Sequence, residues 1–248
     1  MAKQILQNVK LWVGGYDLSA DHNSVTLGDG VELVVEPAFG DLIKTTYAGL
    51  KIADLGAAGL YNTAVTEPQL FANIGAVLPI TVAPGVPSGA EGELAYFLNA
   101  LEAQFDPITA SVGQMAKFKF AARAAGGPLV RGLILRNTPA PGDAATGNGT
   151  VFQLGAIGAA QFLWAAVHVF ALTGGTSPTL TLALQSAPTV GFAAPTTRFT
   201  FTAFTTAPNT AWLTPQVGGP ITDQFWRVTY TITGAPTGWQ YAIAAGIV

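Results

Sequence analysis

Short alternations of apolar and small polar residues recur along the second half of the chain. They occur at residues 179–185 (TLTLALQ), 198–202 (RFTFT), 227–232 (RVTYTI) and 240–244 (QYAIA), with turns rich in Gly and Pro between them. A period of two is typical of β-strands that bury one face, and strands at this regular spacing predict a sandwich. We therefore expect a mainly β protein whose residues 150–248 form an immunoglobulin-like or jelly-roll-like β-sandwich.

The first part of the chain also favours strands, at residues 9–13, 31–35, 117–121 and 129–135. Alternation within 31–35 places three apolar side chains on one face and two acids on the other. We expect the apolar face to point inward. The residues concerned are Val31, Leu33 and Val35 on the inward face, and Glu32 and Glu36 on the opposite face.

One stretch of the first part favours a helix. Ser88 and Glu91 have the spacing of a capping box. Apolar residues then follow at helical intervals, which predicts a helix near 91–105 that flanks the sheet. A shorter helix is expected at 68–74, with Pro68 in its first turn and Gly75 as its stop.

Residues 151–172 are apolar over about the 20 residues that span a bilayer. Gln153, Gln161 and His168 lie within this stretch, and neither flank carries Lys or Arg. Its second half is rich in Trp, Phe and Val, which favours strands. We expect two successive buried strands here and no membrane span, with a membrane helix as the alternative.

Charged residues mark a change along the chain. Residues 1–137 carry 9 Lys or Arg and 12 Asp or Glu, whereas 138–248 carry 2 and 2. The segment 138–149 (TPAPGDAATGNG) has the composition of a linker. We therefore predict a first β domain over 1–137, a linker over 138–149 and an outer β-sandwich domain over 150–248.

The charge balance limits the possible partners. Only 10% of residues are charged and the net charge is -3, whereas nucleic-acid-binding proteins concentrate Lys and Arg. The absence of Cys excludes disulfides and thiolate metal sites. The first 15 residues lack the apolar run of a signal peptide, so we expect the protein to stay in the cytoplasm where it is made.

The sequence offers no catalytic motif. No Ser lies in a G-x-S-x-G turn, and no P-loop, dinucleotide fingerprint or HExxH occurs. His168 has no acid near it in the sequence, so a partly buried strand histidine is expected. We predict no enzyme, no catalytic residue, no metal site and no cofactor; an unrecognised hydrolase is a remaining alternative.

Aromatic residues of the second part leave another function open. Trp212 and Trp239 are candidates for an exposed, sugar-stacking surface, because aromatic faces bind pyranose rings. A carbohydrate-binding or adhesive β-sandwich module is therefore an alternative function. Packing of these residues into the core is the competing interpretation.

Eight segments follow one another along the chain: VKLWVGGYDLSADHNSVTL, EPAFGDLIKTTYAGLK, EGELAYFLNAL, PLVRGLIL, VFQLGAIGAAQFLWAAVHVFAL, SPTLTLALQS, PTTRFTFT and ITDQFWRVTYTITG. In this order they resemble the major tail tube proteins of long-tailed bacteriophages and related prophages. The resemblance covers nearly the whole chain and lies in the order of many weak matches. It implies a tail-tube-like β-sandwich or barrel with a flanking helix over 1–137.

The resemblance also implies a function. Six copies would close a ring, and stacked rings would form the tail tube, the conduit for genome ejection. The partners would be the protein itself and other tail proteins at the tube ends, and DNA would pass through without specific binding. The protein would then be part of the virion tail, assembled in the host cytoplasm.

Two groups of residues are candidates for roles in such a tube. Residues 40–62 lack clean periodicity and would form an arm that reaches a neighbouring ring, with an ordinary surface loop as the alternative. Acids on the lumen wall would repel phosphate and let DNA slide. The arm candidates are Asp41, Lys44, Lys51 and Asp54, and the lumen-facing candidates are Glu32 and Glu36.

Overall fold

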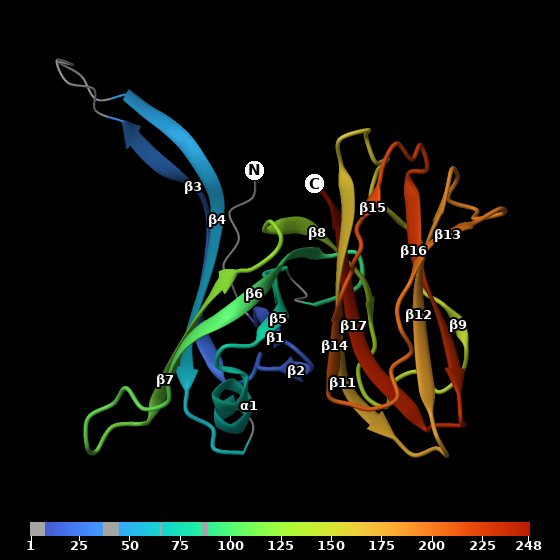
Figure 1. The fold of residues 1–248 in the computed structure, drawn as a ribbon. Coiled ribbons are helices and arrows are strands. Elements are labelled where there is room, and N and C mark those ends of the chain that lie inside the picture. The colour runs from blue at the N-terminus through green and yellow to red at the C-terminus, as the bar shows by residue number, and fades with distance from the viewer. Residues whose placement is uncertain (1–7, 37–44, 65, 86–88) are drawn as a thin grey trace. The chain divides into compact units, whose positions relative to one another are not determined.

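The protein is mainly β, as predicted. The computed structural model describes residues 8–36, 45–64, 66–85 and 89–248, and helix α1 is the one helix within them. Contacts divide the chain into two compact units (Figure 1). Unit 1 comprises residues 1–20, 78–98 and 130–248, and unit 2 comprises 21–77 and 99–129.

Unit 1 is built around a sandwich, as expected from the alternations of the second half. One layer has the strand order β14-β11-β17-β8, and the other has the order β10-β16-β12-β13, with β9 beside β16. The bounds are β8 Val130–Asn137, β9 Gly147–Asn148, β10 Phe152–Gln153, β11 Phe162–Thr173, β12 Thr179–Ala187, β13 Thr196–Thr200, β14 Asn209–Trp212, β16 Phe225–Thr233 and β17 Gly238–Ile247; β15, Val217–Gly218, pairs with β11.

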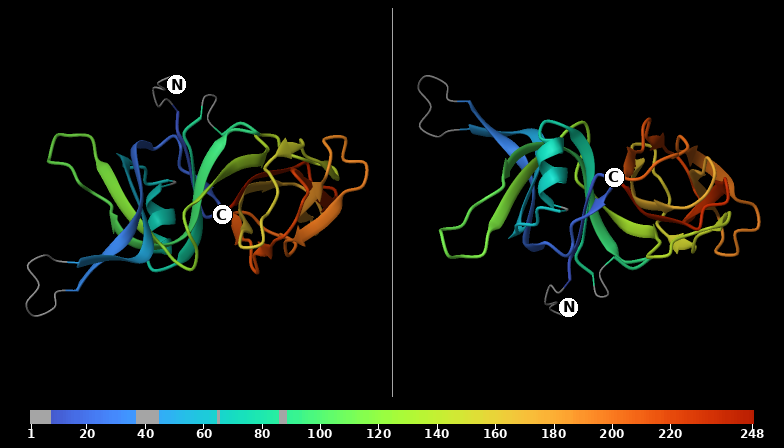
Figure 2. Two further views of the ribbon diagram at one scale, coloured as in Figure 1. Left: turned by 90° about the horizontal axis from the view of Figure 1, so that it is seen from above. Right: turned by 90° about the horizontal axis from the view of Figure 1, so that it is seen from below.

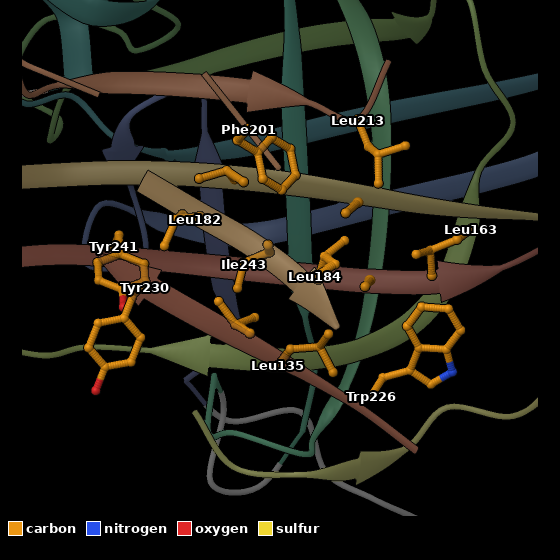
Figure 3. Packing of buried hydrophobic residues seen from close by; sticks show 14 of the residues in the cluster. Leu135, Leu163, Leu182, Leu184, Phe201, Leu213, Trp226, Tyr230, Tyr241 and Ile243 are labelled. Atoms are coloured by element: carbon orange, nitrogen blue, oxygen red, sulfur yellow. The ribbon is translucent and has the colours of Figure 1, made fainter. Parts of the chain in front are cut away.

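Alternation along the strands produces the sandwich core. In β12, Leu180, Leu182 and Leu184 alternate onto the buried face, whereas Thr179 and Thr181 on the other face are only partly buried. The facing strands contribute the same pattern, so the side chains of the two sheets meet between the layers. Figure 3 shows these side chains, among them Leu182, Leu184, Trp226, Tyr230, Tyr241 and Ile243.

Strand β11 is apolar apart from His168 and Thr173, because both faces of its central part are buried. Its odd-numbered residues from Leu163 to Val169 belong to the sandwich core. On the other face, Trp164 and Ala166 join a second cluster with residues such as Trp12 and Phe97. A strand covered on both faces reads as a continuous apolar run. The stretch 151–172 thus holds the short β10 and the long β11, and the described residues include no helix that could cross a membrane.

The large sheet of unit 1 continues through β6, β5, β1 and β2. His168 on β11 links that strand by hydrogen bonds to other segments of the same unit. Its Nδ1 donates to the carbonyl oxygen of Gly14, and its Nε2, 2.7 Å from Thr81 Oγ1, accepts from that hydroxyl. Burial lowers the pKa of His168 to about 4, so the ring is neutral near pH 7. The bounds are β1 Lys10–Val13, β2 Tyr16–Asp17, β5 Val77–Ala83 and β6 Leu94–Asp106.

The helix predicted near 91–105 is wrong, because most of these residues form strand β6. The ladder shifts register between Glu102 and Gln104, and Phe97 and Leu98 are both buried. These breaks in alternation imitate helical spacing, and pairing with β8 and β7 (Lys117–Ala124) decides for a strand. Glu91 does not cap a helix. Its carboxylate accepts from Arg136 Nη1 at 2.9 Å and from Thr150 Oγ1 at 2.9 Å.

Residues 138–149 are largely exposed but are hydrogen-bonded to strands of unit 1. Asp143 accepts from Arg136 Nη2 at 2.7 Å and exchanges backbone hydrogen bonds with Trp239, and Thr138 Oγ1 bonds the Trp239 and Tyr241 carbonyls. The stretch therefore does not have the character of a bare linker. The domain boundary predicted inside it stays a prediction, because the two compact units do not test which segment folds independently.

Unit 2 is a four-stranded antiparallel sheet with the order β3-β4-β7-β6. Helix α1, Thr66–Asn73, lies beside its strands (Figure 2) and confirms the shorter helix predicted at 68–74. Strands β3, His22–Glu36, and β4, Thr45–Leu60, are the longest of the protein. They form the hairpin that carries the candidate functional surface.

Candidate assembly surface

The hairpin of β3 and β4 extends beyond the end of the neighbouring strand, β7. The β3–β4 ladder runs from His22 paired with Gly59 to Glu36 paired with Thr45. Strand β7 pairs with β4 only over its last part, from Asp54 to Leu60. We call residues 28–36 of β3 and 45–53 of β4 the arm. The arm is a two-stranded ribbon that projects from unit 2 in Figure 1, roughly 26 Å long at the usual rise of a strand.

One face of the arm is an exposed apolar stripe. Val31, Leu33 and Val35 alternate onto the same face, as predicted, but they do not point into a core. Leu33 is 70% exposed. The same face of the hairpin is buried further down, where Ala53 and Leu55 lie. The stripe therefore continues a core face beyond the point where the described residues of the unit cover it.

The opposite face of the hairpin carries Glu32, which is exposed, and Val34 opposite Tyr47. Towards the sheet, this face becomes an open hollow of about 390 Å³. Small side chains make up much of the lining of the hollow, together with one acidic and one basic residue. The lining includes Ser24, Thr26, Gly56, Ala58, Ala121, Asp106 and Lys119.

The structure describes only some of the other residues that were predicted to act in the arm. Asp41, Lys44 and the side chain of Glu36 lie outside the described residues. Lys51 is exposed in the arm, opposite Val31. Asp54 lies at the base of the arm and accepts from Arg123 Nε at 2.7 Å, an exposed ion pair of little energetic weight.

A second apolar projection was missed by the sequence interpretation. The loop 107–116 joins β6 to β7, and its Ile108, Val112 and Met115 are exposed. Backbone hydrogen bonds hold the loop, from Thr109 N to Lys117 O at 2.9 Å and from Tyr61 N to Ala116 O at 3.0 Å. The signal in the sequence was three large apolar residues within a turn-like segment, PITASVGQM.

Exposed apolar side chains are concentrated in unit 2. All but three of the large hydrophobic side chains that are exposed in the described residues belong to it; the exceptions are Phe162, Val190 and Val248. Contiguous exposed apolar surface on a folded chain marks an interaction site. Unit 2 is therefore the better candidate for contacts with other subunits.

Of the two interpretations left open for Trp212 and Trp239, the positions of the side chains favour packing into the core. Trp239 is fully buried in the sandwich core. Trp212 is partly buried, with its ring 5.7 Å from that of Trp164 and 5.8 Å from that of Phe97. Alternation places both Trp side chains on faces of the large sheet that other residues cover, so the core interpretation holds for them.

Glu102 is an unexpected buried acid on β6. Its side chain is 2% exposed, and neither carboxylate oxygen has a hydrogen-bond partner among the described residues. Burial raises its pKa to about 8, so the carboxyl is protonated near neutral pH. Buried acids with a shifted pKa often mark functional sites, but the described parts of the chain hold no cluster of three or more His, Asp or Glu residues that could bind a metal ion.

Solved structures with similarity to this chain come from virions, an injection system and a phage adsorption apparatus. A chain from the virion of a native gene transfer agent particle is 16% identical and matches 51% of this chain and 98% of its own length, at a TM-score of 0.38. A chain from the sheath/tube terminator of an extracellular contractile injection system is 15% identical over 53% and 97%, at 0.41. The SPP1 Dit protein is 12% identical over 98% and 100%, at 0.37.

No protein-family model matches the chain, and no curated protein does. The TM-scores under 0.5 and identities under 25% leave the function to be argued from the surface itself.

Proposed function

We propose that this protein is a structural, non-enzymatic subunit of a phage-type virion tail. Copies associate into stacked rings, six to a ring, and the rings form the tube through which the genome leaves. The observation that carries the proposal is the arm, because its apolar stripe is a core face without a cover. Other tail proteins would join at the tube ends, and assembly would take place in the host cytoplasm.

The physical argument rests on the instability of a bare ribbon. A two-stranded hairpin alone is marginally stable in water and needs a third strand or a packed face. The arm has exposed apolar side chains on both faces, among them Leu33, Val34 and Leu50. Its strand edges carry few of the Lys and Pro residues that guard edges in monomeric proteins. A neighbouring subunit would supply the missing cover.

The test of self-assembly replaces the stripe. Burying one Val or Leu contributes about 1.5–3 kcal/mol, so Leu33→Asp with Val35→Asp should weaken assembly by at least ~100-fold. Sedimentation over a concentration series measures this, and circular dichroism checks that the variant stays folded. Val190→Asp is the matched control, since Val190 is equally exposed but lies in unit 1. Unchanged assembly of the double variant would contradict the proposal.

The face of the hairpin that carries Glu32 is our candidate for the lumen wall. Small side chains floor its hollow, so the wall would be smooth, and acids on it would repel the phosphates of DNA. Glu36 follows by alternation in the sequence. Glu32→Lys with Glu36→Lys should leave the monomer folded and slow genome ejection from particles built with it. Normal infectivity of such particles would exclude this role for the two acids.

A further inference from the structure

The geometry points to a head-to-tail contact in which the arm of one copy packs onto the loop 107–116 of the next. This inference rests on the proposed self-assembly and adds the identity of the two surfaces. The apolar stripe of Val31, Leu33 and Val35 is one surface. The exposed side chains of Ile108, Val112 and Met115 are the other.

The register of the sheet places these surfaces at opposite ends. Asp54 of β4, at the base of the arm, pairs with Arg123 near the end of β7. Leu60, at the far end of β4, pairs with Lys117, where β7 begins. The loop 107–116 leads directly into Lys117, so it leaves the sheet at the end away from the arm. Figure 1 shows the two projections at opposite ends of unit 2.

The two ends are complementary in kind. Each presents large apolar side chains that the unit itself leaves exposed, and the loop is held in place by its own hydrogen bonds. Their net charges are also opposite, although not on the face of the stripe, where Asp29 and Lys51 balance: the excess acid of the arm, Glu32, lies on the other face of the hairpin, which also carries the bases of the loop end. The described charges are two acids and one base on the arm, and one acid and two bases at the loop end: Asp29, Glu32 and Lys51, against Asp106, Lys117 and Lys119. None of these six makes an ion pair with another described residue.

A contact between two different surfaces repeats from copy to copy, and it extends as a filament unless the rotation between copies closes it into a ring. Two copies joined through one self-complementary patch would stop at a dimer, whereas an arm on a loop leaves a free arm and a free loop at the ends. Because the two surfaces lie at opposite ends of the strands, a repeat that does not close into a ring extends an assembly along the strand direction of unit 2. In a tube, this is the direction in which rings stack.

Cysteine cross-linking tests the contact, because the chain has no Cys of its own. Protein with Leu33→Cys is mixed with protein carrying Val112→Cys, and a short bis-maleimide is added after assembly. We expect a covalent dimer that contains one copy of each variant and that disappears when Leu33→Cys is mixed with Val190→Cys. As a second measurement, Val112→Asp should weaken assembly at least tenfold.

The outcomes separate the contact from the proposed function. Assembled particles without the mixed dimer, and with unaffected assembly of Val112→Asp, would overturn the contact and leave self-assembly intact. A mixed dimer of Leu33→Cys with Phe71→Cys instead would move the acceptor to α1 and also overturn it. If wild-type protein gives no particles by sedimentation, both the contact and the proposed function fail.

Discussion

Glu102→Gln is expected to abolish most of the fall in the free energy of unfolding that the wild-type protein shows between pH 6.5 and 8. In the folded protein the pKa of Glu102 is raised to about 8 by burial, whereas an unfolded chain releases this proton near the ordinary glutamate pKa of 4.5. The folded state therefore holds one more proton than the unfolded state across this window. Its free energy of unfolding falls as the pH rises, and the loss is complete above the folded pKa.

The size of the effect follows from the slope. One proton contributes about 1.36 kcal/mol for each pH unit, and the difference in bound protons falls to about one half at pH 8, which gives about 1.5 kcal/mol between pH 6.5 and 8. His168 opposes this loss only slightly, because its folded pKa is about 4 and an unfolded His, with a pKa near 6.5, is already half deprotonated at the start of the window. Urea unfolding at several pH values measures the slope.

Glu32→Gln is the control for this prediction, because Glu32 is an exposed acid of the same unit. It should keep the slope of the wild-type protein. If Glu102→Gln also keeps that slope, the carboxyl is ionised in the folded state and the assignment of a protonated Glu102 is wrong.

Arg136→Met is expected to destabilise unit 1 by about 3 kcal/mol, because it leaves two largely buried acids without their cation. Arg136 Nη2 lies 2.7 Å from Asp143 Oδ1, and Nη1 lies 2.9 Å from Glu91 Oε1. The guanidinium also lies over the ring of Tyr230, at 5.1 Å from its centroid. Tyr241 also donates a hydrogen bond to Asp143 at 2.8 Å. The charge of Arg136 therefore stabilises a polar network that joins strands β8, β16 and β17.

Burial opposes the charge on Arg136, but the hydrogen bond and the charge of Asp143 outweigh it and raise the pKa of Arg136. Arg131→Met is the matched control, since Arg131 is exposed on the same strand, β8. Urea unfolding at pH 7 compares the two variants. Equal, small losses in both would contradict a structural role for the network. Arg136→Met combined with Asp143→Asn should recover part of the loss.

The sandwich of unit 1 was predictable because its strands follow the simplest rule. In β12 the Leu residues face a core and the Thr residues do not, so period two is visible in the letters alone. Strand β6 was not, because its bulge shifts the phase of burial and its apolar residues fall at helical intervals. Pairing with β7 and β8 determined the outcome, and pairing partners are distant in sequence.

The candidate surface was half predictable. Alternation correctly grouped Val31, Leu33 and Val35 on one face and Glu32 on the other. It could not tell whether that apolar face is covered, because coverage depends on where β7 stops beside β4. The burial of Glu102 and Trp239 has the same cause: exposure is a property of the neighbouring elements, and a strand sequence carries only its period.

Electron microscopy of the purified protein over a concentration series is the most direct test of self-assembly into a tube. The account predicts rings, and at higher concentration hollow filaments, with a pore wide enough for duplex DNA. Leu33→Asp with Val35→Asp should give neither under the same conditions. Particles of monomer size at every concentration of the wild-type protein would contradict the account.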